Sequence, residues 1–468
     1  MTFNSIVFLF SFLPICLILC YVVPKRFRNV PMLLCSLVFY AWGNPTYLLL
    51  MAFSVVFNYL TGLQLAAYQE EERHTGAKVS MICAVVVNLL VLGFFKYYGF
   101  LLSTINSLTG LHPSAPELPL PLGISFFTFS VLSYVLDVYR GKAEVQKNFL
   151  DFALFVTFFP KVISGPIVQY HDMAAQLKER SMSPAKFGAG ISLFLVGLAK
   201  KVLLADNLGV TFSAISGLDA MSAGTAWLGM ILYSLQLYFD FSGYSDMAIG
   251  LAQLFGFTWE KNFDYPYLST GISEFWRRWH ISLGAWFREY VYIPLGGNRC
   301  SKKRQLLNLS VVWLLTGLWH GAAWNFVFWG IYHGLLVILE KFVLKDAWPK
   351  VPKTLRIFVT TLLAFFGWVL FFSPSLSGAL HYYGQMFGSS HMGLFDSTFR
   401  YYFFGSLRLL ILAVIGCGPL VHTLHQRICY QRGGKAIYIS VVLFLLLLIL
   451  CVAYMLSATY SSFLYTQF

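Results

Sequence analysis

Long apolar runs separated by short polar loops recur along nearly the whole chain. They fall at 5–23, 31–42, 47–66, 79–102, 122–138, 187–204, 226–255, 306–318, 325–339, 358–372, 402–421 and 437–457. Most of them approach the ~20 residues that a helix needs to cross the hydrocarbon core of a bilayer. The pattern predicts an all-α, polytopic integral membrane protein with about twelve transmembrane helices.

Composition strengthens this interpretation. Hydrophobic residues make up 58% of the 468 residues and charged residues 11%, against roughly 45–50% and about 25% in soluble domains. The first run is interpreted as a retained helix, because residues 1–4 carry no Lys or Arg and no small-residue cleavage site follows it. The eight cysteines show no metal-ligand spacing, so we interpret them as packing residues and expect no metal site.

The basic residues predict how the chain is threaded. The formal net charge is +13, and 27 of the 33 Lys and Arg residues fall in alternate loops. The positive-inside rule assigns these loops to the cytoplasmic side, which puts the amino terminus outside. A nucleic-acid-binding domain would instead gather its basic residues on one patch. We therefore expect contact with membrane lipid and none with nucleic acid.

One further apolar segment, 149–170, has basic residues near both ends and contains Pro160, Gly165 and Pro166. Non-helical backbone at membrane depth is tolerated where protein surrounds it. We predict that this segment enters the membrane and returns to the same side. Since no internal repeat or flexible linker interrupts the chain, a single membrane domain over 1–468 is expected.

Ionisable residues inside apolar runs are candidates for function, because burying them is costly. Asp240, Tyr244 and Asp246 lie within one predicted helix. Six residues separate the two carboxylates, whereas neighbours on a helical face are three or four apart, so a shared-proton pair is not expected. Two interpretations stay open: a satisfied polar network that caps or kinks the helix at Gly243, and a contribution to a polar cavity.

A second group alternates aromatic and basic residues over 274–282 and contains Arg277, Arg278 and His280. This pattern is typical of an interfacial helix, whose aromatic rings lie at the level of the lipid headgroups. The composition favours membrane-surface anchoring. The alternative is that the arginines bind the phosphates of a cytosolic donor, since Arg binds phosphate bidentately.

A third group follows the next apolar run, with Trp319, His320, Asn325 and His333 in a Trp-rich setting. A single histidine in a helix is usually a packing residue. His320 differs because it ends an apolar helix and precedes Gly321, which leaves access to its ring. A neutral imidazole there could take a proton from a hydroxyl group. His333 could face the same cavity or stabilise a helix contact.

Several motifs in order resemble one family. Residues 275–283 (FWRRWHISL), 292–299 (YIPLGGNR) and 317–321 (GLWHG) together resemble the membrane-bound O-acyltransferase (MBOAT) family. Residues 95–98, 121–126, 164–166 and 238–250 resemble its alginate O-acetyltransferase branch. The D-alanyl transfer branch shares the Trp-His elements, but the LGGNR sequence favours acetyl transfer.

The resemblance implies a fold of membrane helices, with re-entrant and interfacial helices, around a central funnel and a catalytic core at about 226–343. It identifies His320 with the essential histidine of the family and His280 with its second histidine. Other branches carry Asn or Asp in the first histidine motif, and residues 274–280 contain neither. Binding of substrate is expected to involve Arg277, Arg278, Trp319, Asp240, Asp246, Tyr244, Asn325 and His333.

The activity implied is transfer of an acetyl group from cytosolic acetyl-CoA to hydroxyls of an extracytoplasmic exopolysaccharide or cell-wall polymer. Acetyl-CoA would be a substrate, with no permanently bound cofactor. A periplasmic or surface acetyltransferase is the expected partner, and a bacterial inner membrane is the expected location. The alternatives are a D-alanyl or long-chain acyl transferase, and a non-catalytic subunit of a polysaccharide export complex. A transporter is disfavoured, since it would be built from internal repeats.

Overall fold

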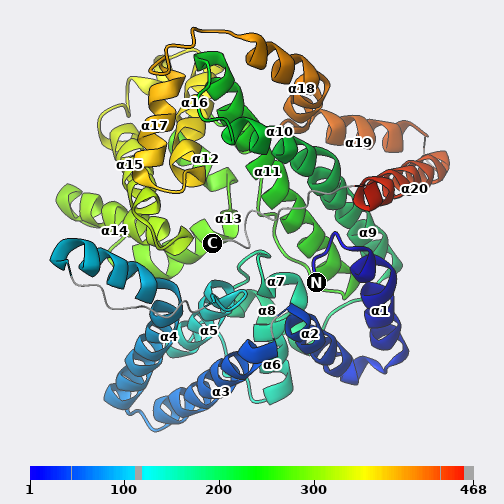
Figure 1. The fold of residues 1–468 in the computed structure, drawn as a ribbon. Coiled ribbons are helices and arrows are strands. Elements are labelled where there is room, and N and C mark those ends of the chain that lie inside the picture. The colour runs from blue at the N-terminus through cyan, green and yellow to red at the C-terminus, as the bar shows by residue number, and fades with distance from the viewer. Residues whose placement is uncertain (44, 111–118, 433, 458–468) are drawn as a thin grey trace. The chain divides into compact units, whose positions relative to one another are not determined.

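The computed structural model describes residues 1–43, 45–110, 119–432 and 434–457. The described residues form helices joined by loops, and none of them lies in a β-strand (Figure 1). This confirms the all-α class. The chain divides into two compact units, Met1–Phe194 with Met247–Glu260 and Leu195–Asp246 with Lys261–Phe468, and each is described by itself. The single-domain organisation stays a prediction.

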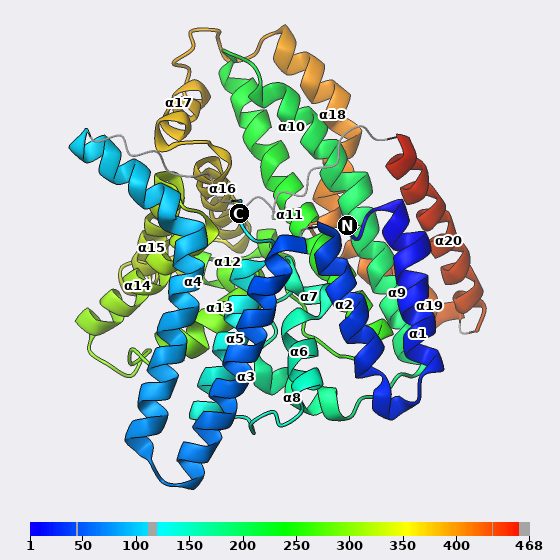
Figure 2. The same cartoon turned by 60° about the horizontal axis from the view of Figure 1, so that its bottom comes forward.

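The first unit contains the amino-terminal helices. They are α1 (Leu13–Val22), α2 (Asn29–Gly43), α3 (Leu48–Glu70), α4 (His74–Thr109), α5 (Ile124–Tyr139), α6 (Phe149–Thr157), α7 (Phe159–Val162), α8 (Tyr170–Lys178) and most of α9 (Pro184–Ala199). Helices α3 and α4 form a long hairpin (Figure 2). Asn58 and Asn88 join them, because each side-chain amide donates to the other's oxygen, at 3.1 and 2.8 Å. Interhelical hydrogen bonds of this kind stabilise helix pairs in membranes.

The segment 149–170 is broken, as predicted. Helix α6 ends at Thr157, α7 has only four residues, and irregular backbone leads to α8. Serine hydroxyls accept hydrogen bonds from backbone N–H groups on either side of the break. Ser36 Oγ accepts from the Phe159 N–H at 3.1 Å, and Ser133 Oγ accepts from the Tyr170 N–H at 3.1 Å. Buried backbone groups need such partners. The path of the segment into the membrane and back stays a prediction.

The second unit carries the motifs that resemble the acyltransferase family. Its helices are the end of α9, α10 (Asp206–Ser216), most of α11 (Ala223–Leu254), α12 (Ile272–Arg278), α13 (Ile281–Phe287), α14 (Lys302–His320), α15 (Trp324–Phe342), α16 (Lys353–Phe372), α17 (Leu376–Met386), α18 (Ser397–Gly416), α19 (Leu420–Arg432) and α20 (Gly434–Ser457). A π-helical turn, Lys200–Ala205, joins α9 to α10. The core of this unit is unusually aromatic, and Trp329 and Trp368 are its largest fully buried side chains.

Six helical stretches among the described residues are long and apolar enough to cross a membrane. They are Pro45–Glu70, His74–Thr109, Pro184–Ser216, Lys353–Phe372, Ser397–Gly416 and Tyr438–Ser457, and two shorter apolar helices span Phe8–Val22 and Ile124–Tyr139. The chain is therefore a multi-pass membrane protein. The count of about twelve spans and the central funnel stay predictions. Helices α2, α11, α14 and α15 lie where spans were also expected, but they belong to neither group.

Glycines bring α14 and α15 into close contact. A Cβ on Gly330 would lie 2.5 Å from the Trp313 carbonyl oxygen, and one on Gly317 would lie 2.4 Å from the Phe326 carbonyl oxygen. Small residues allow such close approach of backbones in membrane helices. Because His320 is the last residue of α14, this contact determines where His320 lies relative to α15.

We predict that Gly330→Ala forces the two helices apart and lowers the free energy of unfolding by about 1–3 kcal/mol, the usual cost of overpacking. The matched control is Gly405→Ala on α18, where a Cβ would meet no atom within 4 Å. That control should be neutral or stabilising by roughly 0.5–1 kcal/mol, since alanine favours the helix. Thermal unfolding of the two variants in detergent measures the difference, and equal midpoints would contradict the prediction.

Candidate active site

His320 ends α14 in a dry aromatic environment. Its side chain is almost fully buried, and its ring centroid lies 4.9 Å from that of Trp319, 4.8 Å from Trp329 and 5.2 Å from Phe371. The first two of these rings meet it edge to face at 74° and 79°. The prediction that His320 ends an apolar helix in a Trp-rich setting is confirmed.

His280 lies at a sharp corner between α12 and α13. Its backbone is left-handed, with φ 45° and ψ 55°, a conformation that few residues other than glycine adopt. The single interfacial helix expected over 274–282 is therefore wrong, because the helix breaks here. Phe275 and Trp279 are buried within the unit and do not lie on a surface, so surface anchoring does not account for them.

Asn262 holds this corner in place. Its carbonyl accepts from the Ile281 N–H at 3.0 Å, and its side-chain oxygen lies 3.2 Å from His280 Nδ1. The same oxygen accepts from the Ser282 N–H at 3.1 Å and from the Ser282 hydroxyl at 3.0 Å. The amide nitrogen of Asn262 donates to Ser245 Oγ on α11 at 3.0 Å. The corner is thus joined to a long helix through one asparagine.

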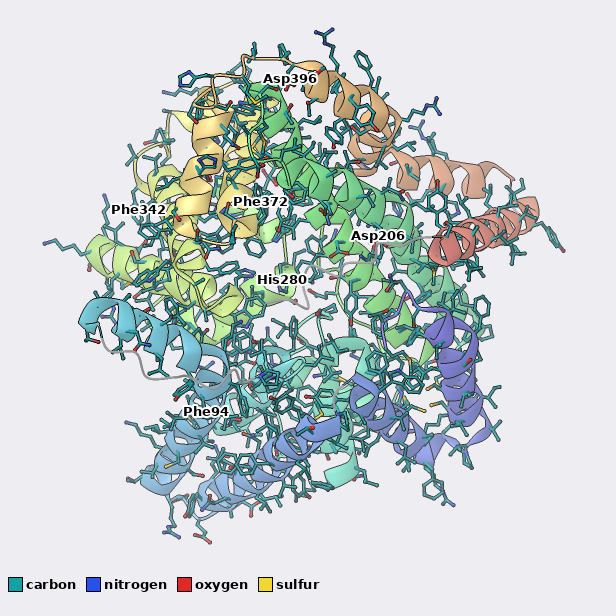
Figure 3. The ribbon with its side chains drawn as sticks, in the orientation of Figure 1. Phe94, Asp206, His280, Phe342, Phe372 and Asp396 are labelled. Atoms are coloured by element: carbon teal, nitrogen blue, oxygen red, sulfur yellow. The ribbon has the colours of Figure 1, made fainter. Side chains whose placement is uncertain are left out.

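The environment of His280 favours the neutral imidazole. The side chain is buried, and burial lowers the pKa of His280 to about 3 because the charged form loses its hydration. Phe241 of α11 contacts the ring edge to face, with centroids 4.7 Å apart. Figure 3 labels His280 on the ribbon. Trp319 contacts both histidines, with its centroid 5.9 Å from that of His280 and 4.9 Å from that of His320.

The aspartates of α11 belong to an ion-pair network with the π-helical turn. Lys201 Nζ lies 2.8 Å from Asp240 Oδ1 and 2.5 Å from Asp206 Oδ1, and the Lys201 side chain has no exposed surface. Lys200 Nζ lies 2.6 Å from Asp246 Oδ2, in a more open position. These contacts match the first of the two interpretations of Asp240 and Asp246, a satisfied polar network. Their contact with a substrate stays a prediction.

The sequence interpretation allowed the helix to be capped at Gly243, but α11 does not end there. The helix runs on to Leu254, and Gly243 is instead the point where the backbone of α9 and the π-helical turn approach it. A Cβ there would lie 2.7 Å from the Gly197 carbonyl oxygen. This close approach is what lets Lys200 and Lys201 reach the two aspartates. Tyr244, predicted to bind substrate, is buried on the same helix.

Asn325 and His333 on α15 make contacts that stabilise the packing of α16. Asn325 donates to the carbonyl oxygens of Leu370 and Ser373 at 3.2 and 2.9 Å, at the carboxyl-terminal end of α16. His333 is fully buried, and its ring centroid lies 4.8 Å from Trp276 and 4.9 Å from Trp329. Of the two roles considered for His333, a helix contact is the one the geometry favours, and its binding of substrate stays a prediction.

The two arginines of the aromatic motif differ. Arg278 pairs with Glu274 at 2.7 Å and donates to the Asp264 carbonyl at 3.3 Å. Burial would raise the pKa of Glu274, but hydrogen bonds from Thr270 and the charge of Arg278 outweigh it, and the pKa lies below its usual value. Arg277 is exposed. Arg277 is thus the better placed of the two to meet an external anion.

The sequence interpretation missed Asn262, Asp206 and both lysines. Lys200 and Lys201 did carry a signal, since they interrupt an apolar run and depart from the distribution expected of cytoplasmic loops. Asp206 lies five residues after Lys201. Asn262 carried no such signal: it lies in a polar loop, and its importance comes from contacts with residues 17 to 20 positions away in the chain.

We predict that Lys201→Met is strongly destabilising, by about 3–5 kcal/mol, because Asp206 and Asp240 stay buried without the cation that pairs with them. Lys200→Met is the matched control. Its side chain and that of Asp246 are 24% and 20% exposed, so water replaces part of the lost pairing and the cost should be about 1 kcal/mol or less. Thermal unfolding in detergent compares them; the prediction fails if Lys200→Met is the more damaging.

Comparisons with known proteins identify the family. The family model of MBOAT, the membrane-bound O-acyltransferase family, matches residues 124–385. A probable alginate O-acetylase AlgI of Pseudomonas aeruginosa is 44% identical over 391 residues, covering 83% of this chain and 75% of the relative. The AlgI of Azotobacter vinelandii is 44% identical, covering 85% and 80%. The peptidoglycan O-acetyltransferase of Helicobacter pylori is 36% identical, covering 84% and 81%. The chain belongs to the membrane-bound O-acyltransferase family and is an O-acyltransferase.

Proposed function

We propose that this enzyme transfers an acetyl group from cytosolic acetyl-CoA, across the membrane, to hydroxyl groups of an extracytoplasmic polysaccharide. The observation that carries the proposal is the pair of buried histidines, His320 and His280, whose rings both contact Trp319. Relatives named for the O-acetylation of alginate and of peptidoglycan support an acetyl donor and a polymer acceptor. A bacterial inner membrane fits both kinds of polymer.

In the proposed reaction His320 is the general base. It takes the proton from an acceptor hydroxyl while the hydroxyl oxygen bonds to the thioester carbonyl carbon. The bond between that carbon and sulfur then breaks, and the thiolate takes the proton from His320 as it leaves. The products are an acetyl ester and free CoA. Such proton transfer contributes typically about 10²–10⁴-fold to a rate.

A relay through an acetylated His320 would use the same residues in two steps. The ring nitrogen would first displace the thiolate, which takes the proton that the ring loses on acylation. The acceptor hydroxyl would then displace the nitrogen and return its own proton to the ring. In both versions the acetyl ester forms toward the outer face. Where the acceptor hydroxyl belongs to a periplasmic or surface acetyltransferase partner, that partner would pass the acetyl group on to the polymer. Asp240, Asp246, Tyr244, Trp319, Asn325 and His333 stay predicted substrate contacts in this proposal.

We predict that His320→Ala lowers acetyl transfer by at least about 10²-fold and leaves membrane insertion intact. The assay is radiolabelled acetyl-CoA with purified protein in lipid vesicles, with and without candidate partner proteins, following label into polymer. His74→Ala is the control, since that histidine is exposed at the start of α4. Undiminished transfer by His320→Ala would overturn the assignment and favour a non-catalytic subunit. Turnover of palmitoyl-CoA or of a D-alanyl donor in place of acetyl-CoA would favour the sister activities.

The exposed Arg277 gives a separate prediction about the donor. If it meets the phosphates of acetyl-CoA, Arg277→Ala should raise the KM for acetyl-CoA roughly tenfold, which corresponds to one charge-assisted hydrogen bond, with little change in kcat. Arg277→Lys keeps the charge, so its KM for acetyl-CoA should lie between that of the native enzyme and that of Arg277→Ala. An unchanged KM for Arg277→Ala would exclude this arginine from donor binding.

A further inference from the structure

The corner that carries His280 is fixed by Asn262 on both backbone and side chain. The backbone of 262–264 runs beside the corner, with the Ile281 N–H donating to the Asn262 carbonyl at 3.0 Å and the Asp264 N–H donating to the Arg278 carbonyl at 2.9 Å. Asn262 itself is 1% exposed. Its side chain therefore meets His280 in a fixed geometry.

The orientation of the Asn262 amide follows from its neighbours. The Ser282 backbone N–H lies 3.1 Å from one of the two amide atoms, and a backbone N–H can only donate, so this atom is the oxygen Oδ1. The nitrogen then faces Ser245 Oγ at 3.0 Å and donates to it. A flipped amide would set two N–H donors against each other at Ser282. The assignment thus rests on hydrogen-bonding logic, as amide assignments do.

This orientation decides which ring nitrogen of His280 carries the proton. Asn262 Oδ1 only accepts, and it lies 3.2 Å from His280 Nδ1. Two lone pairs at that distance would repel, so Nδ1 carries the hydrogen and donates it. Ser282 Oγ gives its own hydrogen to Oδ1 at 3.0 Å, and its lone pairs face Nδ1 at 3.4 Å. Burial keeps the ring neutral, so the lone pair of His280 lies on Nε2.

We propose that Asn262 is a positioning residue that holds His280 in the Nδ1–H tautomer, so that His280 meets the reacting groups as a hydrogen-bond acceptor through Nε2. The inference rests on the proposed acetyl transfer and deepens it, because it states which way the second histidine forms its hydrogen bond. In this state His280 accepts a hydrogen bond from a hydroxyl or thiol. It does not donate to the oxyanion that forms when the hydroxyl attacks the thioester.

The test reads the tautomer directly, without any need for turnover. Protein carrying ¹⁵N-labelled histidine rings is placed in lipid vesicles, and solid-state NMR distinguishes protonated from unprotonated ring nitrogens. The spectrum of His280→Gln identifies the His280 signals by difference. We expect native His280 to show a protonated Nδ1 and an unprotonated Nε2. A protonated Nε2 in the native protein overturns the proposal.

Variants at Asn262 then test its role. Asn262→Leu removes the acceptor and should give a mixture of tautomers, with kcat lowered roughly 10²-fold, as expected for a misplaced catalytic group, and an unchanged KM for acetyl-CoA. Asn262→Asp keeps an acceptor at the same position, so it should keep the Nδ1–H form and restore much of kcat even if the leucine variant folds poorly. Retention of a pure Nδ1–H form in a folded Asn262→Leu protein overturns the proposal.

Two controls separate this inference from the proposed function. Asn308→Ala removes another buried asparagine of the same unit, whose side chain donates to the Leu295 carbonyl at 3.1 Å, and it should leave the His280 signals unchanged. His320→Ala should lower acetyl transfer by at least about 10²-fold and also leave the His280 tautomer unchanged. If Asn262→Leu loses the Nδ1–H form of His280 but keeps acetyl transfer, the role of Asn262 is contradicted and the proposed function stands. If the Nδ1–H form is found but transfer does not depend on His320, the proposed function is contradicted and the tautomer assignment stands.

Discussion

Polar groups buried in a membrane protein must find their partners within the protein, because the hydrocarbon offers none. In the first unit this requirement accounts for the paired side-chain amides of Asn58 and Asn88. It also accounts for the serine hydroxyls that accept hydrogen bonds from backbone N–H groups of the broken segment. In the second unit it accounts for Lys201 between Asp206 and Asp240. The same requirement fixes the amide of Asn262, and through it the corner of His280. Polar pairing therefore determines the geometry of the candidate site as well as the packing of the helices.

The aromatic core of the second unit acts together with this pairing. Trp319 and Trp329 lie against His320, and Trp276 and Trp329 lie against His333. Rings of this size exclude water from the surroundings of both imidazoles. Two of the histidines, however, are used differently: His333 packs between helices, whereas His320 ends its helix at a glycine.

The sequence predicts the helices well, since hydrophobic periodicity and length are local properties. The apolar runs at 47–66, 226–255 and 358–372 correspond to α3, α11 and α16. The position of His320 at a helix end could also be predicted, from the apolar run before it and the glycine after it. The short polar helices α8, α17 and α19 could not, because they are too short or too polar to stand out by hydropathy.

What the sequence could not predict depends on contacts between distant segments. Residues 274–282 have the composition of one amphipathic helix, yet the backbone turns at His280 because the loop around Asn262 binds it there. Likewise, Asp240 and Asp246 are six residues apart and do not share a helical face. They belong to one network because consecutive lysines on a π-helical turn reach them: Lys201 pairs with Asp240 and Lys200 with Asp246. Such turns are frequent at functional sites, but no local pattern of the chain distinguishes this one.

The dry environment also constrains the order of events in acyl transfer. Separating an imidazolium from an alkoxide or thiolate in a medium of low dielectric constant is costly. Transfer of the proton from the hydroxyl and formation of the bond to carbon are therefore favoured in one step, with the charge on the imidazole short-lived. If His280 accepts through Nε2, the developing oxyanion must be stabilised by other donors. An N–H group of another side chain or of the backbone has to face the thioester carbonyl, and this requirement restricts how the donor can lie relative to the two histidines.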